Sequence, residues 1–371
     1  MEILHVITGL QKAAGTSVFC GEVANGLVAM GHDVTIAVAN PVAQNLYPLN
    51  AQVKLISISA LLTSNFYPLT PNSVVHIHGL WSPLLHKVSS WVHKNKIPVV
   101  WSPHGMLQKW ALKNKLLKKV IALVLYQWRD LAKADLFHAT AESEVEDIRR
   151  LKLKNKIVVA PLGVRIAAEI AGEKQDENKK RTLLFVSRVQ RKKGLPVLID
   201  AWAKLPKEFH QNWEVRIVGP DQEGHISELK AQCLNREVLD DFTFVGPKYG
   251  EDLNREYKAA DLFVLPTHSE NFGSVVIEAL AHKVPVICSQ GAPWKELETY
   301  GCGWWPEDSV IALQSVLMKS MRLSDRELKE MGERGRRLVE EKYTWGAVCA
   351  AMVRGYESIV GDRSQEIGVR S

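Results

Sequence analysis

The sequence has few cysteines and no long apolar run, and both absences narrow the class of protein. Its five cysteines are scattered over 371 residues and form no Cys-x-x-Cys pair. The longest central apolar run, Val120–Tyr126, is far too short to cross a bilayer. The opening residues have no basic region and no small-residue cleavage site. We therefore expect no secretory leader, and reduced core thiols in a cytoplasm.

Several motifs that define large enzyme classes are also missing. The first glycine turn, "GLQKAAGTS", is not G-x-G-x-x-G, and no G-x4-G-K-[ST] occurs, which argues against a nicotinamide oxidoreductase and a P-loop NTPase. No Asp-x-Asp is present, so we expect no metal clamp on a diphosphate. His76 and His78 alternate on one expected strand and raise the question of a metal pair. No carboxylate or cysteine is near them in sequence, and we interpret them as structural.

Acidic residues are absent from a long part of the first half. No Asp or Glu occurs between Asp33 and Asp130, whereas ten Lys or Arg do. Residues 1–165 hold 18 Lys and Arg against 9 Asp and Glu, and the remainder holds 29 against 32, within a net charge of +6. Such a positive face attracts phosphates, nucleic acids or anionic lipid. A basic surface that is merely solvated fits the charge equally well.

Apolar runs alternate with segments of helical length in both halves of the chain. Continuous apolar runs of this kind are typical of parallel sheets that are buried on both faces. We predict an α/β protein of GT-B type, with two Rossmann-like doubly wound domains that face a cleft. The domains are expected at 1–165 and 180–344, with a linker at 166–179. A final helix at about 345–362 is expected to pack back on the first domain.

Candidate site residues follow directly after the apolar runs. In open α/β sheets, ligands bind beyond the carboxyl ends of the strands. Gly15 follows the first run, and His104 follows the run "VVWSP". In the second half, Arg188 follows the run "TLLFVS", and Glu270 follows the run "DLFVLPTHS". We therefore expect these residues at ligand-binding edges of the two sheets.

The segment "ENFGS" is predicted to be a strand-to-helix turn, with Glu270 before it and Glu278 within the helix. Backbone N–H groups at a helix start bind anions, and two carboxylates accept paired hydrogen bonds from vicinal hydroxyls. Arg188 and Lys193 supply a guanidinium and an ammonium for a diphosphate. Each residue alone fits an ordinary solvated position. Together they favour a nucleotide sugar as the ligand.

At this point the chain resembles family 4 of the retaining glycosyltransferases, which have the GT-B architecture. "SRVQRKKG" (Ser187–Gly194) matches the family's Arg-x4-Lys-Gly element, and Glu-x7-Glu lies within "PTHSENFGSVVIEALAHKVPVI" (Pro266–Ile287). Further matches such as "SPHG", "VVAPLGV" and "ADLFVLPT" extend the resemblance over about the whole chain. "GAPWKELETYGCGWW" (Gly291–Trp305) is similar to bacterial polysaccharide-synthesis members. Within it, Trp294 fits a place beside the cleft or in the core equally well.

The resemblance implies a role for each candidate residue. Arg188 and Lys193 would neutralise the donor diphosphate, and Glu278 would hold the ribose hydroxyls. His104 would contact the sugar near the reacting carbon, and Gly15 would admit the phosphates close to the backbone. The donor sugar would be held by Glu270 and by the amides of the turn that follows it, Asn271, Phe272, Gly273 and Ser274.

Three departures from the family pattern concern the edge of the site. Asn271 replaces a common Gly, "PLGVR" (Pro161–Arg165) replaces a common Pro-Asn-Gly-Val-Asp, and Ala14 precedes Gly15 where a Gly pair is usual. None of them removes a residue expected to bind phosphate.

The stretch without carboxylates also bears on stereochemistry. An inverting enzyme needs a base on the acceptor side, and only His76, His78 or His104 would remain for that task. Front-face attack with retention, in which the leaving phosphate accepts the proton, fits better. The resemblance points the same way.

The segment 109–133 has two interpretations. Leu117, Ile121, Val124, Trp128 and Leu131 recur at helical spacing beside clustered lysines. We slightly favour a core-facing helix with a basic solvent side over an interfacial helix on anionic membrane. Relatives that act on lipid-diphosphate-linked glycans would suit the second interpretation and a peripheral place on the inner membrane face.

The sequence thus predicts a cytoplasmic, metal-independent, retaining glycosyltransferase with no cofactor beyond its donor. A hexose or N-acetylhexosamine would pass from a UDP- or GDP-sugar to a glycan or lipid-linked saccharide in surface polysaccharide synthesis, such as that of lipopolysaccharide. Two alternatives stay open: a GT-B glycan phosphorylase, and a non-catalytic basic protein that binds membrane or nucleic acid. Nucleic acid is not an expected partner of the enzyme.

Overall fold

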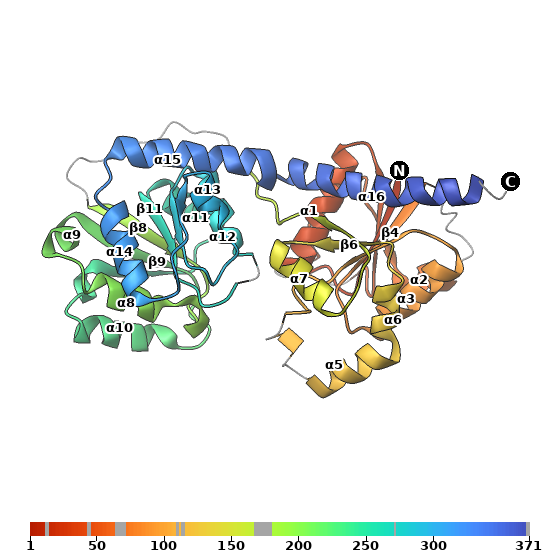
Figure 1. Ribbon diagram of the computed structural model, residues 1–371, viewed down its shortest axis with the longest axis horizontal. Helices are drawn as coiled ribbons and strands as arrows, with labels where there is room; N and C mark the ends of the chain where they lie inside the picture. The colour runs from red at the N-terminus through yellow and green to blue at the C-terminus, as the bar shows by residue number, and fades with distance from the viewer. Residues whose placement is uncertain are drawn as a thin grey trace. The chain divides into compact units, whose positions relative to one another are not determined.

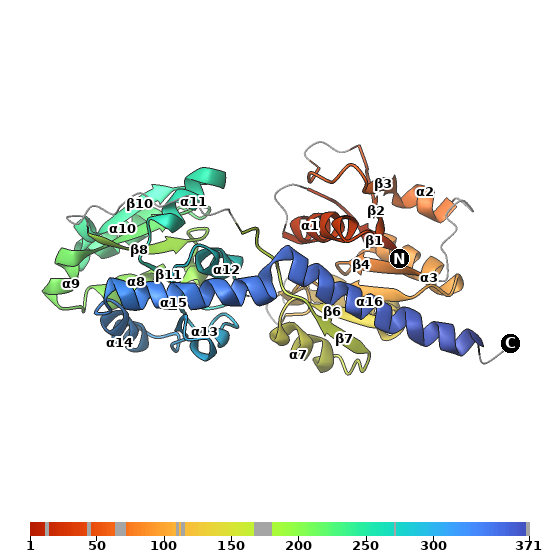
Figure 2. The ribbon, with the colours of Figure 1, turned by 90° about the horizontal axis from the view of Figure 1, so that it is seen from above.

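The computed structural model describes residues 1–11, 15–42, 46–63, 72–108, 111–112, 116–166, 180–270 and 272–368, with side chains to 361. The chain divides into two compact units, Met1–Gly163 with Trp345–Ser371, and Val164–Thr344. Figures 1 and 2 show that each unit is a sheet covered by helices. Most of the expected linker at 166–179 lies outside the described residues.

The N-terminal unit is built on a seven-stranded parallel sheet of order β3-β2-β1-β4-β5-β6-β7. Its strands are β1 (Glu2–Ile7), β2 (Asp33–Val38), β3 (Lys54–Ser57), β4 (Ser73–His78), β5 (Val99–Ser102), β6 (Leu136–Ala139) and β7 (Lys156–Val159). Its helical segments are α1 (Gly15–Ala29), α2 (Ile58–Thr63), α3 (Pro83–Lys94), α5 (Leu116–Ala122), the π-helical η1 (Leu123–Gln127), α6 (Trp128–Ala132), α7 (Glu142–Arg150) and α16 (Trp345–Gly368).

Alternate residues of each strand supply the two cores of this unit. Ile3 and Val74 pack with α1 and α16 on one face, while Leu4 and Val75 pack with α2 and α3 on the other. Helices α1 and α16 lie side by side. They approach closely at Gly26, where an added Cβ would lie 2.5 Å from Cys349 Sγ. The last helix therefore completes the core of the unit that the first half of the chain builds.

The C-terminal unit repeats the architecture with a six-stranded parallel sheet of order β10-β9-β8-β11-β12-β13. Its strands are β8 (Arg181–Val186), β9 (Trp213–Val218), β10 (Phe242–Gly246), β11 (Leu262–Leu265), β12 (Val286–Cys288) and β13 (Gly303–Trp304). Its helical segments are η2 (Arg191–Lys193), α8 (Leu195–Trp202), α9 (Lys207–Asn212), α10 (His225–Asn235), η3 (Leu239–Asp241), α11 (Gly250–Lys258), α12 (Ser274–Ala281), α13 (Glu296–Thr299), α14 (Val310–Ser320), α15 (Asp325–Leu338) and η4 (Val339–Tyr343).

The strand order explains where ligands can bind in each unit. In the C-terminal sheet, β8 and β11 are neighbours although two strands separate them in sequence. The connections that leave their carboxyl ends run in opposite directions, which opens a crevice at this switch point. The predicted class, two parallel-sheet Rossmann-like α/β units, is confirmed.

The interpretation of segment 109–133 as a core-facing helix is wrong for most of its apolar residues. Leu117 is 79% exposed, Val124 78% and Trp128 50%, whereas Leu131 is fully buried. Helical periodicity correctly grouped these side chains on one face of a helix. Of that face, however, the rest of the described protein buries only the end, at Leu131. No helix in the described part of the chain is long and apolar enough to cross a membrane.

A chain of buried hydrogen bonds ties α16 to the N-terminal sheet. It runs from Tyr356 Oη to His76 Nδ1 (2.7 Å), from His76 Nε2 to Ser102 Oγ (2.5 Å), from Ser102 Oγ to His138 Nδ1 (2.6 Å), and from His138 Nε2 to the carbonyl of Ala160 (2.7 Å). A carbonyl only accepts, so His138 donates from Nε2 and accepts from Ser102. The same reasoning makes His76 the donor to Ser102, and Tyr356 the donor to His76. When the imidazoles are neutral, every hydrogen bond in this series therefore points the same way, from Tyr356 towards Ala160.

Tyr356→Phe should destabilise the N-terminal unit, because it leaves Nδ1 of His76 buried without a donor. We expect a loss of about 1–3 kcal/mol in the free energy of unfolding, measured by urea denaturation. Tyr249→Phe is the control, since Tyr249 is 74% exposed and its loss should change stability by less than about 0.5 kcal/mol. Equal effects of the two substitutions would contradict the assignment.

Candidate functional site

The switch point of the C-terminal sheet brings two distant motifs into contact. Lys193 lies in η2 after β8, and Glu270 lies in the loop after β11. The Lys193 ammonium donates to the Glu270 carboxylate, and Lys193 is only 5% exposed. The two loops are also joined by their backbones, since His268 N–H donates to the carbonyl of Lys192 at 2.9 Å.

Burial and the neighbouring charges act against each other on the Lys193 ammonium. Burial lowers its pKa most, the Glu270 carboxylate raises it, and Lys192 and Arg188 lower it further. A buried cation needs a partner of opposite charge, and Glu270 supplies it. An added diphosphate would give the same ammonium a second anionic partner.

The backbone of the lysine loop fits only glycine at one position. Gly194 has φ +72°, and an added Cβ would lie 1.7 Å from the carbonyl oxygen of Pro266. The lysine loop thus lies directly against the start of the glutamate loop. This contact explains why glycine follows lysine in the Arg-x4-Lys-Gly element.

The amino end of α12 adjoins Glu270. Gly273 precedes the helix with φ +79°, and an added Cβ there would lie 3.3 Å from Glu270 Cγ. Among the residues that the structure describes, the N–H groups of Phe272, Gly273 and Ser274 have no hydrogen-bond partner. They form the kind of helix start that binds anions. Asn271 lies outside the described residues.

A cluster of three aromatic rings packs against the turn between Glu270 and α12. Trp294 Nε1 donates to the carbonyl of Phe272, and the rings of Phe272, Trp294 and Tyr343 lie 5.0–5.8 Å apart. Trp294 is 1% exposed. Of the two expected places for Trp294, the structure gives the core, where it positions the glutamate loop.

Glu278 lies one helix turn further along α12 and remains partly exposed. Tyr257 Oη donates to its Oε2 at 2.8 Å. Burial raises the pKa of Glu278, while the hydrogen bonds from Tyr257 and Ser274 oppose that rise. Sequence reasoning missed Tyr257, which holds the carboxylate that we expect to bind hydroxyls.

Arg188 has few contacts within the unit. Its side chain is exposed and makes one long hydrogen bond, 3.4 Å from Nη1 to Gln222 Oε1. No described residue forms an ion pair with it. Arg191, three residues on, is instead paired with Glu228 at 2.6 Å. Of these two arginines, Arg188 is the one that has no anionic partner among the described residues.

In the N-terminal unit, His104 follows β5 in an uncommon backbone conformation with φ +52°. The turn is held by Glu144, a fully buried carboxylate in the first turn of α7. It accepts from Gly105 N–H at 2.5 Å, from Thr140 N–H at 2.8 Å and from Thr140 Oγ1 at 2.9 Å. Sequence reasoning missed Glu144, because acidic residues are common in first helical turns whatever their task.

His104 and Gly15 both belong to the carboxyl edge of this sheet. Phe19, one turn after Gly15 in α1, packs its ring edge-on against His104 at 5.3 Å. An added Cβ on Gly15 would meet nothing within 4 Å. No packing contact of the described residues explains this glycine, and its predicted approach to phosphates stays a prediction.

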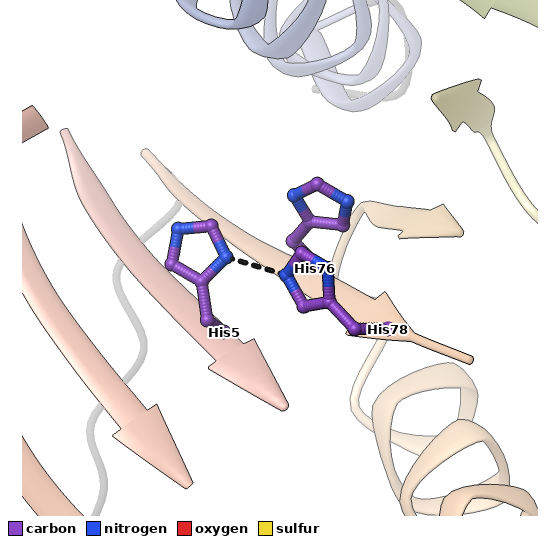
Figure 3. A group of neighbouring side chains, drawn as sticks. All are labelled: His5, His76 and His78. Atoms are coloured by element: carbon purple, nitrogen blue, oxygen red, sulfur yellow. Dashed lines mark hydrogen bonds between the residues drawn. The ribbon is translucent and has the colours of Figure 1, made fainter. Parts of the chain in front are cut away.

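Four buried histidines, His5, His76, His78 and His138, and the partly exposed His104 lie close together in the N-terminal unit. Three of them, His5, His76 and His78, have ring nitrogens within 4.8 Å of one another (Figure 3). By distance this group could hold a metal ion. However, five of its six ring nitrogens already have hydrogen-bond partners. Hydrogen bonding therefore accounts for the cluster, in keeping with the structural interpretation of His76 and His78.

Comparisons with known proteins identify the family of the chain. Residues 167–338 match the family model described as glycosyl transferases group 1, and residues 13–168 match that of glycosyltransferase family 4. D-inositol 3-phosphate glycosyltransferase of Kineococcus radiotolerans is 26% identical over 305 residues, which cover 73% of this chain and 68% of that protein. Alpha-monoglucosyldiacylglycerol synthase of Streptococcus pneumoniae is 28% identical over 222 residues, which cover 55% of this chain and 49% of that enzyme.

Solved structures extend the likeness to the whole fold. Sucrose-phosphate synthase from Thermosynechococcus elongatus aligns with a TM-score of 0.72 at 19% identity, over 100% of both chains. WaaG, a glycosyltransferase involved in lipopolysaccharide biosynthesis, aligns with a TM-score of 0.66 at 15% identity, over 97% of this chain and 100% of that one. The fold is therefore that of a two-domain GT-B glycosyltransferase. The chain belongs to the group 1 glycosyltransferases of family 4.

The stability of the N-terminal unit should fall in mild acid because of the buried histidines. Burial lowers the pKa of His5 and of His104 to about 3 and that of His138 to about 4, and it also lowers the pKa of His76 and of His78. Below pH 6.5 the unfolded chain binds more protons, so the free energy of unfolding should decrease. Its slope should approach about 1.4 kcal/mol per pH unit for each histidine.

Urea denaturation between pH 7.5 and 4.5 measures this effect. Burial raises the pKa of Glu144 and of Asp130, which acts in the opposite direction but involves two groups against five histidines. A midpoint that stays constant from pH 7 to 5 would contradict the prediction.

Proposed function

We propose that this chain is a metal-independent, retaining glycosyltransferase that uses a UDP- or GDP-sugar. It transfers a hexose or N-acetylhexosamine to a saccharide or lipid-diphosphate-linked glycan in surface polysaccharide synthesis. The observation that carries the proposal is the contact of Lys193 with Glu270 beside the start of α12. An ammonium, a carboxylate and free backbone N–H groups at one switch point suit a pyrophosphate joined to a sugar.

The cations act on the leaving group. When the bond from the sugar to the phosphate breaks, negative charge grows on the nucleoside diphosphate. Lys193, Arg188 and the N–H groups at α12 stabilise that charge, because they are in place before the reaction. The two cations take the part that a metal ion has in enzymes with an Asp-x-Asp motif, which this sequence lacks.

The carboxylates hold hydroxyl groups of the donor. Glu270 accepts from the sugar, and Glu278, oriented by Tyr257, accepts from the ribose. Two structural neighbours support a uridine donor: HepE of Anabaena was solved in complex with UDP-glucose, and a trehalose-6-phosphate protein of E. coli with UDP-2-fluoro glucose. Their identities of 14% and 11% make this support for the donor class alone.

The histidines of the N-terminal unit support retention. An inverting reaction needs a base on the acceptor side, and the sequence has no carboxylate from 34 to 129. Burial lowers the pKa of His76, His78 and His104, so all three are weak bases. The departing phosphate then takes the proton of the attacking hydroxyl on the same face of the sugar.

The acceptor is proposed to reach the enzyme at a membrane. An apolar patch on α5, η1 and α6 is exposed to solvent: Leu116, Leu117, Val120, Ile121, Val124, Leu125 and Trp128. Lys118 and Lys119 lie on the same helix. A helix with exposed apolar residues beside lysines binds the interface of anionic bilayers. The relative from Streptococcus pneumoniae, by its name, makes a glycolipid.

A thermal-shift panel of UDP-, GDP- and ADP-sugars tests the donor site. A sugar nucleotide that binds only the folded state should raise the melting temperature. Arg188→Ala should weaken binding about 30-fold, since a charged hydrogen bond is worth about 2 kcal/mol. Arg191→Ala should not, because Arg191 is already paired with Glu228. Salt-sensitive nucleic-acid binding without any nucleotide-sugar binding would overturn the proposal and favour a non-catalytic protein.

Flotation with lipid vesicles tests the apolar patch. Leu117→Glu with Val124→Glu should reduce recovery on phosphatidylglycerol vesicles at least about tenfold, because two apolar side chains would leave the bilayer. Leu234→Glu is the matched control, an exposed leucine (64%) in the C-terminal unit. Equal recovery of the native protein on neutral and anionic vesicles would refute the electrostatic part. Unchanged recovery of the double variant would refute the patch itself.

A further inference from the structure

Three imidazoles form a second hydrogen-bonded chain that ends at His104, the candidate site residue of the N-terminal unit. His5 on β1 contacts His78 on β4 through Nδ1 and Nε2 at 2.9 Å, which Figure 3 shows as a dashed line. His78 Nδ1 in turn lies 2.9 Å from Nε2 of His104. His5 and His78 are fully buried, whereas His104 is partly exposed. The chain therefore leads from the core to the edge of the sheet.

This chain differs from the one that contains His76 and His138. That chain ends on the carbonyl of Ala160, which sets the direction of every hydrogen bond in it. The chain of His5, by contrast, has no carbonyl at its inner end. Nε2 of His5 is buried and has no partner among the described residues.

Two arrangements of protons are possible in a chain of three neutral imidazoles. In the first, each ring carries its proton on Nδ1, so His5 donates to His78 and His78 donates to His104. The atom left over in the core is then an unprotonated Nε2 on His5. In the second, each ring carries its proton on Nε2, and the atom left over is a buried N–H.

The free energy cost of leaving Nε2 of His5 unpaired in the core decides between the two arrangements of protons. Buried N–H groups without a partner are rarer in proteins than buried acceptors without one, and the missing hydrogen bond of a buried donor costs free energy. The first arrangement leaves only a lone pair unpaired in the core. It also places an N–H on Nδ1 of His104, which has no partner among the described residues. There it is free to donate to a ligand.

We infer that His78 and His5 are positioning residues that fix His104 in the Nδ1–H form. His104 thereby offers a hydrogen-bond donor, and no base, to an oxygen of the transferred sugar. This inference rests on the proposed function for its substrate, though not for the state of the ring. Glu144 contributes by holding the turn in which His104 has positive φ.

Nitrogen-15 NMR of histidine-labelled full-length protein tests the state of the ring without any substrate. His5, His78 and His104 should each show a proton on Nδ1 and none on Nε2. His76 and His138 should show the reverse, a proton on Nε2, and so provide an internal control within the same core. Signals are assigned by loss in single variants, beginning with His104→Asn. A proton on Nε2 of His104, or a doubly protonated ring at pH 7.5, would overturn the inference.

Steady-state kinetics test whether the positioning matters. His78→Leu removes the partner of His104 and should lower kcat about 10- to 100-fold, as loss of an outer partner of a functional histidine does, while KM for the donor changes little. His78→Asn keeps a donor near the place of Nδ1 and should restore kcat to within about threefold of native. His76→Leu is the matched control, two residues away on β4 and equally buried.

The three variants separate positioning from stability. His76→Leu should lower the melting temperature as much as His78→Leu does, yet leave kcat within about threefold. Equal losses of kcat in His76→Leu and His78→Leu would overturn a specific role for His78. If the NMR pattern is found and no nucleotide sugar turns over, the proposed function fails while the assigned ring state stands. If turnover is found with a proton on Nε2 of His104, this inference alone fails.

Discussion

One buried ion pair, between Lys193 and Glu270, organises the C-terminal unit. It forms because β8 and β11 are neighbours in the sheet although 77 residues separate the two side chains. The Lys193 ammonium would not be stable in that place alone, since a buried ion without a partner costs several kcal/mol, about 3–5. The glycine that follows Lys193, the turn before α12 and the tryptophan behind that turn all hold the two loops in the position that this contact needs.

The N-terminal unit depends on a different constraint. Each of its neutral histidine rings has one nitrogen that donates a hydrogen bond and one that accepts, which fixes the direction of the hydrogen bonds among them. One chain of rings is closed at both ends and ties α16 to the sheet. The other is open at His104, at the carboxyl edge of that sheet. The same five histidines thus make the core sensitive to acid and leave a hydrogen-bond donor at the edge. Stability and chemistry in this unit share one cause, which is the burial of imidazoles that hydrogen-bond to one another, to hydroxyl groups or to a carbonyl, and not to a carboxylate.

Much of the fold and of the candidate site was predictable from the sequence. Buried parallel strands have continuous apolar sequences, and the candidate site residues follow these runs directly. The fold class and the contact of the two motifs after β8 and β11 belong to this part. Periodicity failed for Leu117 and Val124, since it identifies a face but not what covers it. Glu144 and Tyr257 were missed because their partners are distant in sequence and their residue types are ordinary in helices. The roles of all the candidate site residues, including Lys193, Glu270 and His104, stay predictions.

The most direct test of the donor site is calorimetric titration of a UDP- or GDP-sugar into the double variant Lys193→Met with Glu270→Gln. Both charges disappear together, so no uncompensated ion remains in the core and the fold should persist. The account predicts a melting temperature near that of the native protein and an affinity for the nucleotide sugar at least about 100-fold weaker. A folded double variant that binds the donor as tightly as the native protein would contradict it.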